Sequence, residues 1–206
     1  MSTVLEINMA DQTEKQRAKK KQIITAAIHC FVQKGFHATS TAEICKAAGM
    51  SPGNLFHYYP TKNAIIEAIA LQDQADLAML LQIEQTNGSA IETVITMMTR
   101  LLQLYNEPTY ARLSLEIIAE ASRNPVINST FIENEKIVRQ QLVDVLKHGV
   151  SNSEIDPKLS IENTASWLMT IADGAIGRDL MEPEFDLANR LESFIYMIKK
   201  ILMPIK

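Results

Sequence analysis

The chain has 206 residues, of which 47% are hydrophobic and 21% charged, and its formal net charge is −4. This composition is that of a globular protein with a sizeable core, and it excludes the polar, highly charged mixture of a disordered chain. Two cysteines are too few for a disulfide framework, and polar residues interrupt every apolar run before it reaches the ~18 residues that span a bilayer. No signal-peptide pattern is recognisable, so we expect a cytoplasmic protein without a membrane partner.

Helix-forming residues dominate the chain, and only 7 glycines and 7 prolines are spread over it, which predicts an all-α fold. The first helix should begin at Thr13, which forms a capping-box pattern with Gln16. Gly35 should end it. Residues 1–12 are then expected to be a flexible arm.

Two short helices are predicted next. Ser40 with Glu43 three residues later is a second capping box, and Gly49 supplies the stop for the helix that it opens. Ser51 followed by Pro52 is the start signal of another short helix, because proline fits the first helical position.

Six longer helices are predicted in the rest of the chain, which shows no strand-like alternation. The start and stop signals that separate them are Thr61, Asn87-Gly88, Ser89, Pro108, Pro125, Ser160 and Pro183. We therefore expect about nine helices: a three-helix domain over residues 13–62 and a larger helical domain over residues 63–206.

Charge is divided unequally along the chain. Residues 1–62 carry 8 basic and 4 acidic side chains, whereas residues 63–206 carry 12 basic and 20 acidic ones. A basic segment joined to an acidic body is typical of a protein that meets a polyanion at one end. A solvated lysine-rich helix face is the alternative reading of the run over residues 17–21.

The two short helices, joined by a glycine turn after a longer helix, form a helix-turn-helix pattern over about residues 40–59. The second helix of such a motif enters the DNA major groove. Small helical bundles share this spacing, so the side chains are needed to distinguish a DNA-binding motif from an ordinary bundle. The second helix carries Asn54, His57 and Tyr58, which suit contacts to base edges or phosphates, and the helix start beside Ser40 favours a phosphate.

At these residues the sequence resembles a known family. The run over residues 35–62, GFHATSTAEICKAAGMSPGNLFHYYPTK, is similar to the DNA-binding signature of the TetR/AcrR family of bacterial transcriptional regulators. Three residues depart from the family pattern. Cys45 and Met50 are apolar exchanges in the local core, while Asn54 is expected to change which bases are read. The remainder of the chain agrees with the family in helix count and length.

The resemblance implies which residues contact DNA, with Thr39, Ser40, Tyr58 and Lys62 at phosphates. The full set of expected DNA-contacting residues is Thr39, Ser40, Thr41, Ser51, Pro52, Gly53, Asn54, His57, Tyr58 and Lys62. The basic run over residues 17–21, at the start of the first helix, is expected to approach the phosphate backbone as well.

The resemblance also implies a homodimer formed through the last two helices. Small residues there permit close helix approach, and apolar residues cover more of the last helix than one core face requires. The residues expected at the dimer contact are Ala172, Ala175, Leu191, Phe194, Ile198 and Ile201. An internal core position for both helices is the competing interpretation.

A ligand cavity is expected between the helices of the larger domain. The candidate lining residues are Met98, Tyr105, Glu116, Glu120, Trp167 and Asp173. Carboxylates beside aromatic rings suit a lipophilic cation. The alternatives are that methionine at helical spacing is core and that these acids are exposed or paired with arginines.

The function expected is that of a homodimeric repressor, released from a palindromic operator by a small molecule. An activator, or an architectural DNA-binding protein without a ligand, is the alternative. An enzyme is not expected, because the four histidines lack metal-ligand spacing and no phosphate-binding loop or nucleophile elbow occurs. No cofactor or metal is expected. Whether Cys30 and Cys45 are structural or redox-active stays open.

Overall fold

The computed structural model of the chain describes residues 2–81 and 88–204, and its side chains from residue 14 onward. The described residues form ten helices and no strand, which confirms the all-α prediction. The chain divides into two compact units, Met1–Leu71 and Gln72–Lys206, here called the N-terminal and C-terminal units. The division falls inside α4 (Lys62–Leu80), so the first turns of this helix belong to the N-terminal unit rather than to the larger domain.

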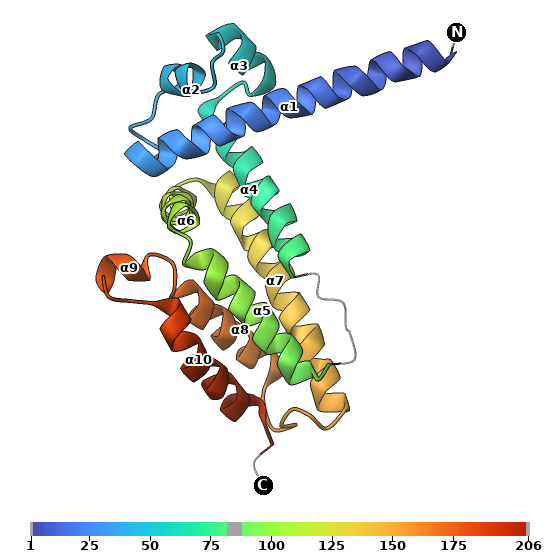
Figure 1. The fold of residues 1–206 in the computed structure, drawn as a ribbon, viewed down its shortest axis with the longest axis vertical. Helices are drawn as coiled ribbons and strands as arrows, with labels where there is room; N and C mark the ends of the chain where they lie inside the picture. The colour runs from blue at the N-terminus through green and yellow to red at the C-terminus, as the bar shows by residue number, and fades with distance from the viewer. Residues whose placement is uncertain (1, 82–87, 205–206) are drawn as a thin grey trace. The chain divides into compact units, whose positions relative to one another are not determined.

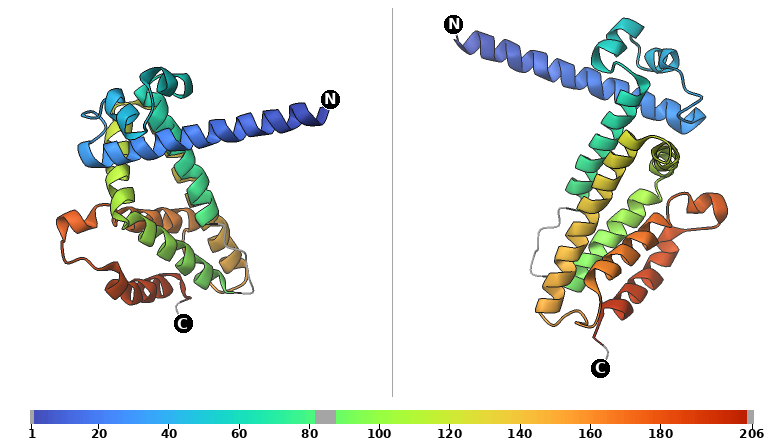
Figure 2. Two further views of the ribbon diagram at one scale, coloured as in Figure 1. Left: turned by 45° about the horizontal axis from the view of Figure 1, so that its top comes forward. Right: turned by 180° about the vertical axis from the view of Figure 1, so that it is seen from behind.

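The first helix differs from its prediction. Helix α1 spans Ser2–Lys34, so the segment expected to be a flexible arm is helical, and the capping pattern at Thr13 does not start the helix. The physical reason is that no glycine or proline interrupts the chain before Gly35, so nothing breaks the ladder of hydrogen bonds. In Figure 2, α1 extends as one rod well beyond α2 and α3 of the same unit.

The two helices of the motif begin where their capping residues predict. In α2 (Thr41–Ala47), the Ser40 hydroxyl accepts from the Glu43 backbone N–H at 3.2 Å, and the Ser40 N–H donates to the Glu43 carboxylate at 2.8 Å. In α3 (Pro52–Tyr58), Ser51 is the N-cap and Pro52 the first residue. Gly49 has a φ of 61° between them, a left-handed conformation that a side chain would strain.

The C-terminal unit is a bundle built around α5 (Ala90–Tyr105). This helix packs against α6 (Pro108–Ala121), α7 (Pro125–Ser151), α8 (Ile161–Asp173) and α10 (Leu187–Leu202) (Figure 1). Buried leucine, isoleucine, valine and methionine side chains from all but α6 form one continuous core with α5. None of the described helices is long and apolar enough to cross a membrane.

One helix more than predicted occurs among the described residues, because a single turn, α9 (Arg178–Met181), precedes the last helix. This turn starts after Gly177, whose φ of 68° lies in the left-handed region that favours glycine. The last helix then begins at Leu187, where the Asp186 carboxylate accepts from the Ala188 N–H at 2.9 Å. Ser160 precedes α8 as predicted, but its side chain makes no capping bond.

Close approach of α7 to its neighbours requires a glycine at position 149. A Cβ atom there would lie 2.5 Å from the Ile155 Cδ1 and 2.7 Å from the Ala90 Cβ. We expect Gly149→Ala to lower the free energy of unfolding by about 1–3 kcal/mol, the usual cost of an overpacked core. Urea denaturation measures this change.

Gly53→Ala is the matched control, because no atom lies within 4 Å of a Cβ built at Gly53 and alanine favours a helix. The control should retain or gain stability. Equal stability of the Gly149→Ala variant and the unsubstituted protein would contradict the packing described for α7.

Candidate nucleic-acid interface

The recognition surface is the solvent-exposed side of α3 and its N-terminal turn. Four of the predicted residues are consecutive and exposed, from Ser51 to Asn54, and His57 is exposed one turn later. Leu55 and Tyr59 are buried and fix the helix to the rest of the unit. The spacing of these two anchors leaves the polar residues facing outward together, as a surface that reads a groove requires.

An apolar residue also belongs to this surface. The Phe56 side chain is 42% exposed, although the neighbouring Leu55 is buried. Adjacent helical residues point about 100° apart, so helical periodicity alone distinguishes Phe56 from its buried neighbour. An exposed aromatic ring on α3 suits contact with a thymine methyl group.

The N-terminus of α2 is less available to a phosphate than the sequence suggested. Thr39 is only 1% exposed, and its hydroxyl donates to the Gly35 carbonyl at 2.8 Å. Burial and this bond keep the Thr39 hydroxyl inside the unit and away from a phosphate. The Ser40 hydroxyl lies 2.8 Å from the Glu43 carboxylate. A hydrogen-bonded ion pair with Lys34 and bonds from Ser40 lower the pKa of Glu43 to about 2.

Lys62 is also turned into the protein. Its Nζ lies 2.7 Å from the Phe36 carbonyl oxygen and 3.0 Å from that of Thr39. It is also 3.4 Å from the His37 carbonyl oxygen and 4.3 Å from the centre of the Phe36 ring. These contacts use the ammonium group within the N-terminal unit, and the phosphate contact of Lys62 stays a prediction.

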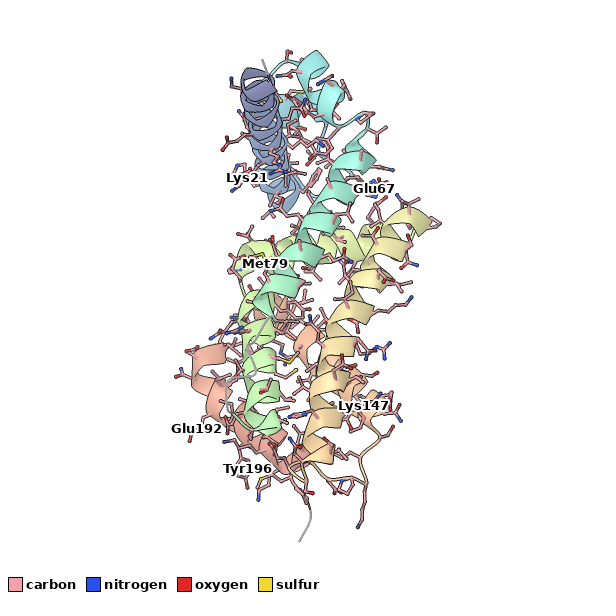
Figure 3. All side chains as sticks on the ribbon, turned by 90° about the vertical axis from the view of Figure 1, so that its right-hand side faces the viewer. Lys21, Glu67, Met79, Lys147, Glu192 and Tyr196 are labelled. Carbon is pink, nitrogen blue, oxygen red and sulfur yellow. The ribbon has the colours of Figure 1, made fainter. Side chains whose placement is uncertain are left out.

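Residues 15–21 of α1 form a basic surface. Five basic residues there are exposed: Lys15, Arg17, Lys19, Lys20 and Lys21. Figure 3 labels Lys21 on this helix. The next residue is Gln22, whose side chain donates to the Ala48 carbonyl at 2.6 Å and ties α1 to the end of α2. The basic surface is thus held to the helix-turn-helix motif by a direct bond.

In the C-terminal unit, two tyrosines and three acids from five helices come together; we call them the acid-tyrosine cluster. The rings of Tyr105 and Tyr110 stack with centres 5.7 Å apart, and the Tyr110 hydroxyl donates to the Asp73 carboxylate at 2.9 Å. Burial raises the pKa of Tyr105, and so do the charges of Asp173, Asp73 and Glu135. Each of these carboxylates therefore lies close enough to act on the same ring.

Two acids of this cluster, Asp73 and Asp173, have raised pKa values. Burial, with a smaller contribution from Asp76, raises the pKa of Asp73 to about 6, although the Tyr110 hydroxyl opposes this shift. Partial burial and the charge of Glu135 raise the pKa of Asp173 to about 6. Carboxylates gathered at a low-dielectric aromatic site attract a positive charge and repel a negative one.

The predicted ligand residues are only partly brought together. Tyr105 and Asp173 belong to the cluster, whereas Met98 is buried in the core and Trp167 is 69% exposed. Glu120 is buried and Glu116 half-buried on α6. Sequence reasoning missed Asp73 and Glu135, because no local pattern links α4 and α7 to Tyr105.

The predicted dimer residues divide between core and surface. Ala172, Ala175 and Ile198 are buried inside the C-terminal unit, so these three predictions are corrected: their side chains fill the core of their own protomer. Ile201 is exposed, while Leu191 and Phe194 are half-buried.

The remaining surface of α8, α9 and α10 nevertheless exposes several large apolar side chains. They are Trp167, Leu180, Met181, Tyr196, Met197, Ile201 and Met203. Figure 3 labels Tyr196 on α10. An open groove of about 600 Å³ is lined mainly by α8 and α10 and includes Ile171, Phe194 and Met197. Large apolar side chains exposed in this number are typical of a protein interface.

Comparisons with known proteins agree with this geometry. Residues 23–69 match the model of the bacterial regulatory proteins of the tetR family, and residues 90–195 match that of the BetI-type transcriptional repressor C-terminal domain. The transcriptional regulator UidR of Escherichia coli K12 is 31% identical over 166 residues, covering 80% of this chain and 83% of UidR. The repressor AcnR of Corynebacterium glutamicum is 23% identical over 80% of this chain and 84% of its own.

Solved structures extend the likeness to the fold. GusR of Salmonella enterica superposes with a TM-score of 0.71 at 27% identity, covering 89% of this chain and 96% of GusR. FadR of Bacillus subtilis, solved with stearoyl-CoA, has a TM-score of 0.76 at 19% identity over 88% of this chain and 98% of its own. The relatives are transcriptional regulators rather than enzymes. With a helix-turn-helix motif of matching sequence and a helical C-terminal unit, the chain belongs to the TetR family of bacterial transcriptional regulators.

Proposed function

We propose that the protein is a homodimeric repressor that binds a palindromic operator and is released from it by a small-molecule ligand. The observation that carries this proposal is the exposed surface of α3 beside the basic surface of α1. One recognition helix contacts few base pairs, so paired copies reading two half-sites provide the specificity that a regulator needs. The likeness to a BetI-type repressor domain and to AcnR favours repression over activation.

Within each half-site, Asn54, Phe56 and His57 are assigned to the bases. The remaining contacts are assigned to Ser40, Thr41, Ser51, Pro52, Gly53 and Tyr58, with Gly53 permitting close approach. An asparagine amide can form two hydrogen bonds with the major-groove edge of adenine, at N6 and N7, so Asn54 is the residue that reads sequence most directly. The exposed lysines of α1 supply salt-dependent affinity that is independent of sequence.

The dimer is assigned to the exposed apolar surface of α8 and α10. Trp167, Tyr196 and Ile201 are its central residues, because each is large and exposed on these helices. Aromatic side chains with a polar edge are enriched in protein interfaces. Burial of these side chains in a second copy removes an apolar surface that a lone protomer leaves in water.

The ligand is assigned to the acid-tyrosine cluster, and its chemistry to a lipophilic cation. Asp73, Glu135 and Asp173 disfavour an anionic ligand, while the stacked Tyr105 and Tyr110 offer aromatic surface to a cation. Release follows from a population shift, in which the ligand favours a conformation that does not fit DNA. Helix α4 is the connecting element, since it carries Asp73 and its first turns belong to the N-terminal unit.

The proposed function is tested by selecting bound sites from random duplex DNA. A palindromic site with half-sites about one helical turn apart is the expected product. Chromatography on the isolated complex should find two protomers on each duplex. Enrichment of no site, or of a site bound by a single protomer, would overturn the dimeric operator model.

Substitutions in α3 separate base reading from backbone binding. Asn54→Ala should change the preferred bases and cost about 1–3 kcal/mol at the favoured site. Tyr58→Ala should weaken all sequences alike, and both variants should remain dimeric. Repeating the site selection with each variant measures the difference, and an unchanged site preference for Asn54→Ala would rule out its assigned role.

The proposed ligand chemistry predicts a specific pH dependence. Tetraphenylphosphonium is a suitable probe, because its charge does not change with pH. Its affinity should rise roughly 10-fold from about pH 5 to about pH 7.5, as carboxyl groups with pKa values near 6 ionise. Isothermal titration of the probe, with Asp73→Asn and Asp173→Asn variants beside it, should show a smaller pH effect in each variant.

Stability provides a control that needs no ligand. Folding raises the pKa values of Asp73 and Asp173 above their unfolded values, so the neutral forms favour the folded state. The free energy of unfolding should therefore fall as pH rises from about 4 through 6, and less so in the asparagine variants. Probe binding of equal strength at both pH values would contradict a cation site at these acids.

A further inference from the structure

The contacts of Lys62 point to a role other than holding a phosphate. Its ammonium group meets three backbone carbonyl oxygens, those of Phe36, His37 and Thr39, at 2.7–3.4 Å. All three belong to the turn between α1 and α2. These carbonyls follow the C-terminal end of α1, where the helix dipole is negative and a cation is favoured.

The same turn is tightly packed around this ammonium group. The Phe36 ring is buried and contacts the Phe31 ring edge-on, with centres 5.2 Å apart. The Lys62 Nζ lies 4.3 Å from the centre of the same Phe36 ring. The Thr39 hydroxyl donates back to Gly35 at 2.8 Å. Lys62, the first residue of α4, is thus bonded to the segment that directly precedes Ser40, the N-cap of α2.

We propose that Lys62 is a positioning residue that locks the first turn of α4 to the α1–α2 turn, so that the helix-turn-helix motif moves with α4. This inference rests on the proposed operator binding and adds the element through which α4 controls the motif. Lys62 acts on DNA through the placement of α2 and α3, without contacting a phosphate. One ammonium group with three donors fits three carbonyl oxygens around a point, which a planar guanidinium does not.

The salt dependence of operator binding distinguishes a lysine that contacts a phosphate from one that positions the motif. Each phosphate contact that is lost lowers the slope of log affinity against log salt by about 0.9, hence by about 1.8 for a dimer. We expect Lys62→Gln to weaken operator binding by roughly 10-fold or more with an unchanged slope between about 50 and 300 mM KCl. The exposed Lys20 is the matched control, and Lys20→Gln should lower both affinity and slope.

Hydrogen exchange on the free full-length protein tests the lock without DNA. The backbone amides of residues 35–44, of which Gly35 and Ile44 donate to the carbonyls of Phe31 and Ser40, should exchange faster in Lys62→Gln than in the unsubstituted protein, and at an unchanged rate in Lys20→Gln. Because this measurement needs no operator, failure of the proposed operator binding would remain distinguishable from failure of the lock. Unchanged exchange at these amides in Lys62→Gln would overturn the proposal.

Lys62→Arg keeps the test decisive if the glutamine variant does not fold. Arginine keeps the charge and binds phosphate well, so a phosphate contact would survive this change with full affinity. The lock predicts weaker operator binding by Lys62→Arg, with an unchanged salt slope and faster exchange over residues 35–44. Full affinity in Lys62→Arg, or a lowered slope in Lys62→Gln, would assign Lys62 to the DNA backbone instead.

Discussion

Burial of the apolar face of α1 against α2 and α3 is the constraint on which DNA reading depends. Helices of seven residues are too short to be stable alone in water. The buried side chains of Ile23 and Phe31 on α1, Ile44 on α2 and Leu55 on α3 supply the stability that the short helices lack. This core occupies one side of α3 only, which leaves Asn54 and His57 exposed on the other.

The helices of the motif were predictable because their signals are local. Ser40 with Glu43, and Ser51 with Pro52, act within one turn, and the structure places each helix start there. The start of α1 was predicted wrongly from an equally local pattern, since a capping sequence does not end a helix that continues through it. The contacts of Thr39 and Lys62 were not predictable for another reason: their partners lie at Gly35 and Phe36, and the folded turn alone brings these groups together.

The C-terminal unit shows where sequence reasoning stops. An apolar residue on an amphipathic helix is compatible with a core or an interface, so Ile198 and Ile201 look alike in sequence although one is buried and the other exposed. The partnership of Asp73 with Tyr110 joins residues 37 apart, and no periodicity within either helix encodes it. Tyr105 and Asp173 were predicted as ligand residues because an aromatic or acidic side chain is conspicuous on a helix of mainly apolar residues.

Charge links the two ends of the proposed regulator. A cation bound between carboxylates removes their mutual repulsion, so it stabilises the conformation that holds Asp73 and Asp173 near Tyr105. Linkage then requires that DNA and the cation weaken one another by the same factor. That factor is limited by the difference in cation affinity between the two conformations. Helix α4 carries both Asp73 and Lys62. In the proposed mechanism, the Lys62 lock therefore determines how strongly a conformational change at Asp73 alters the position of the recognition helix.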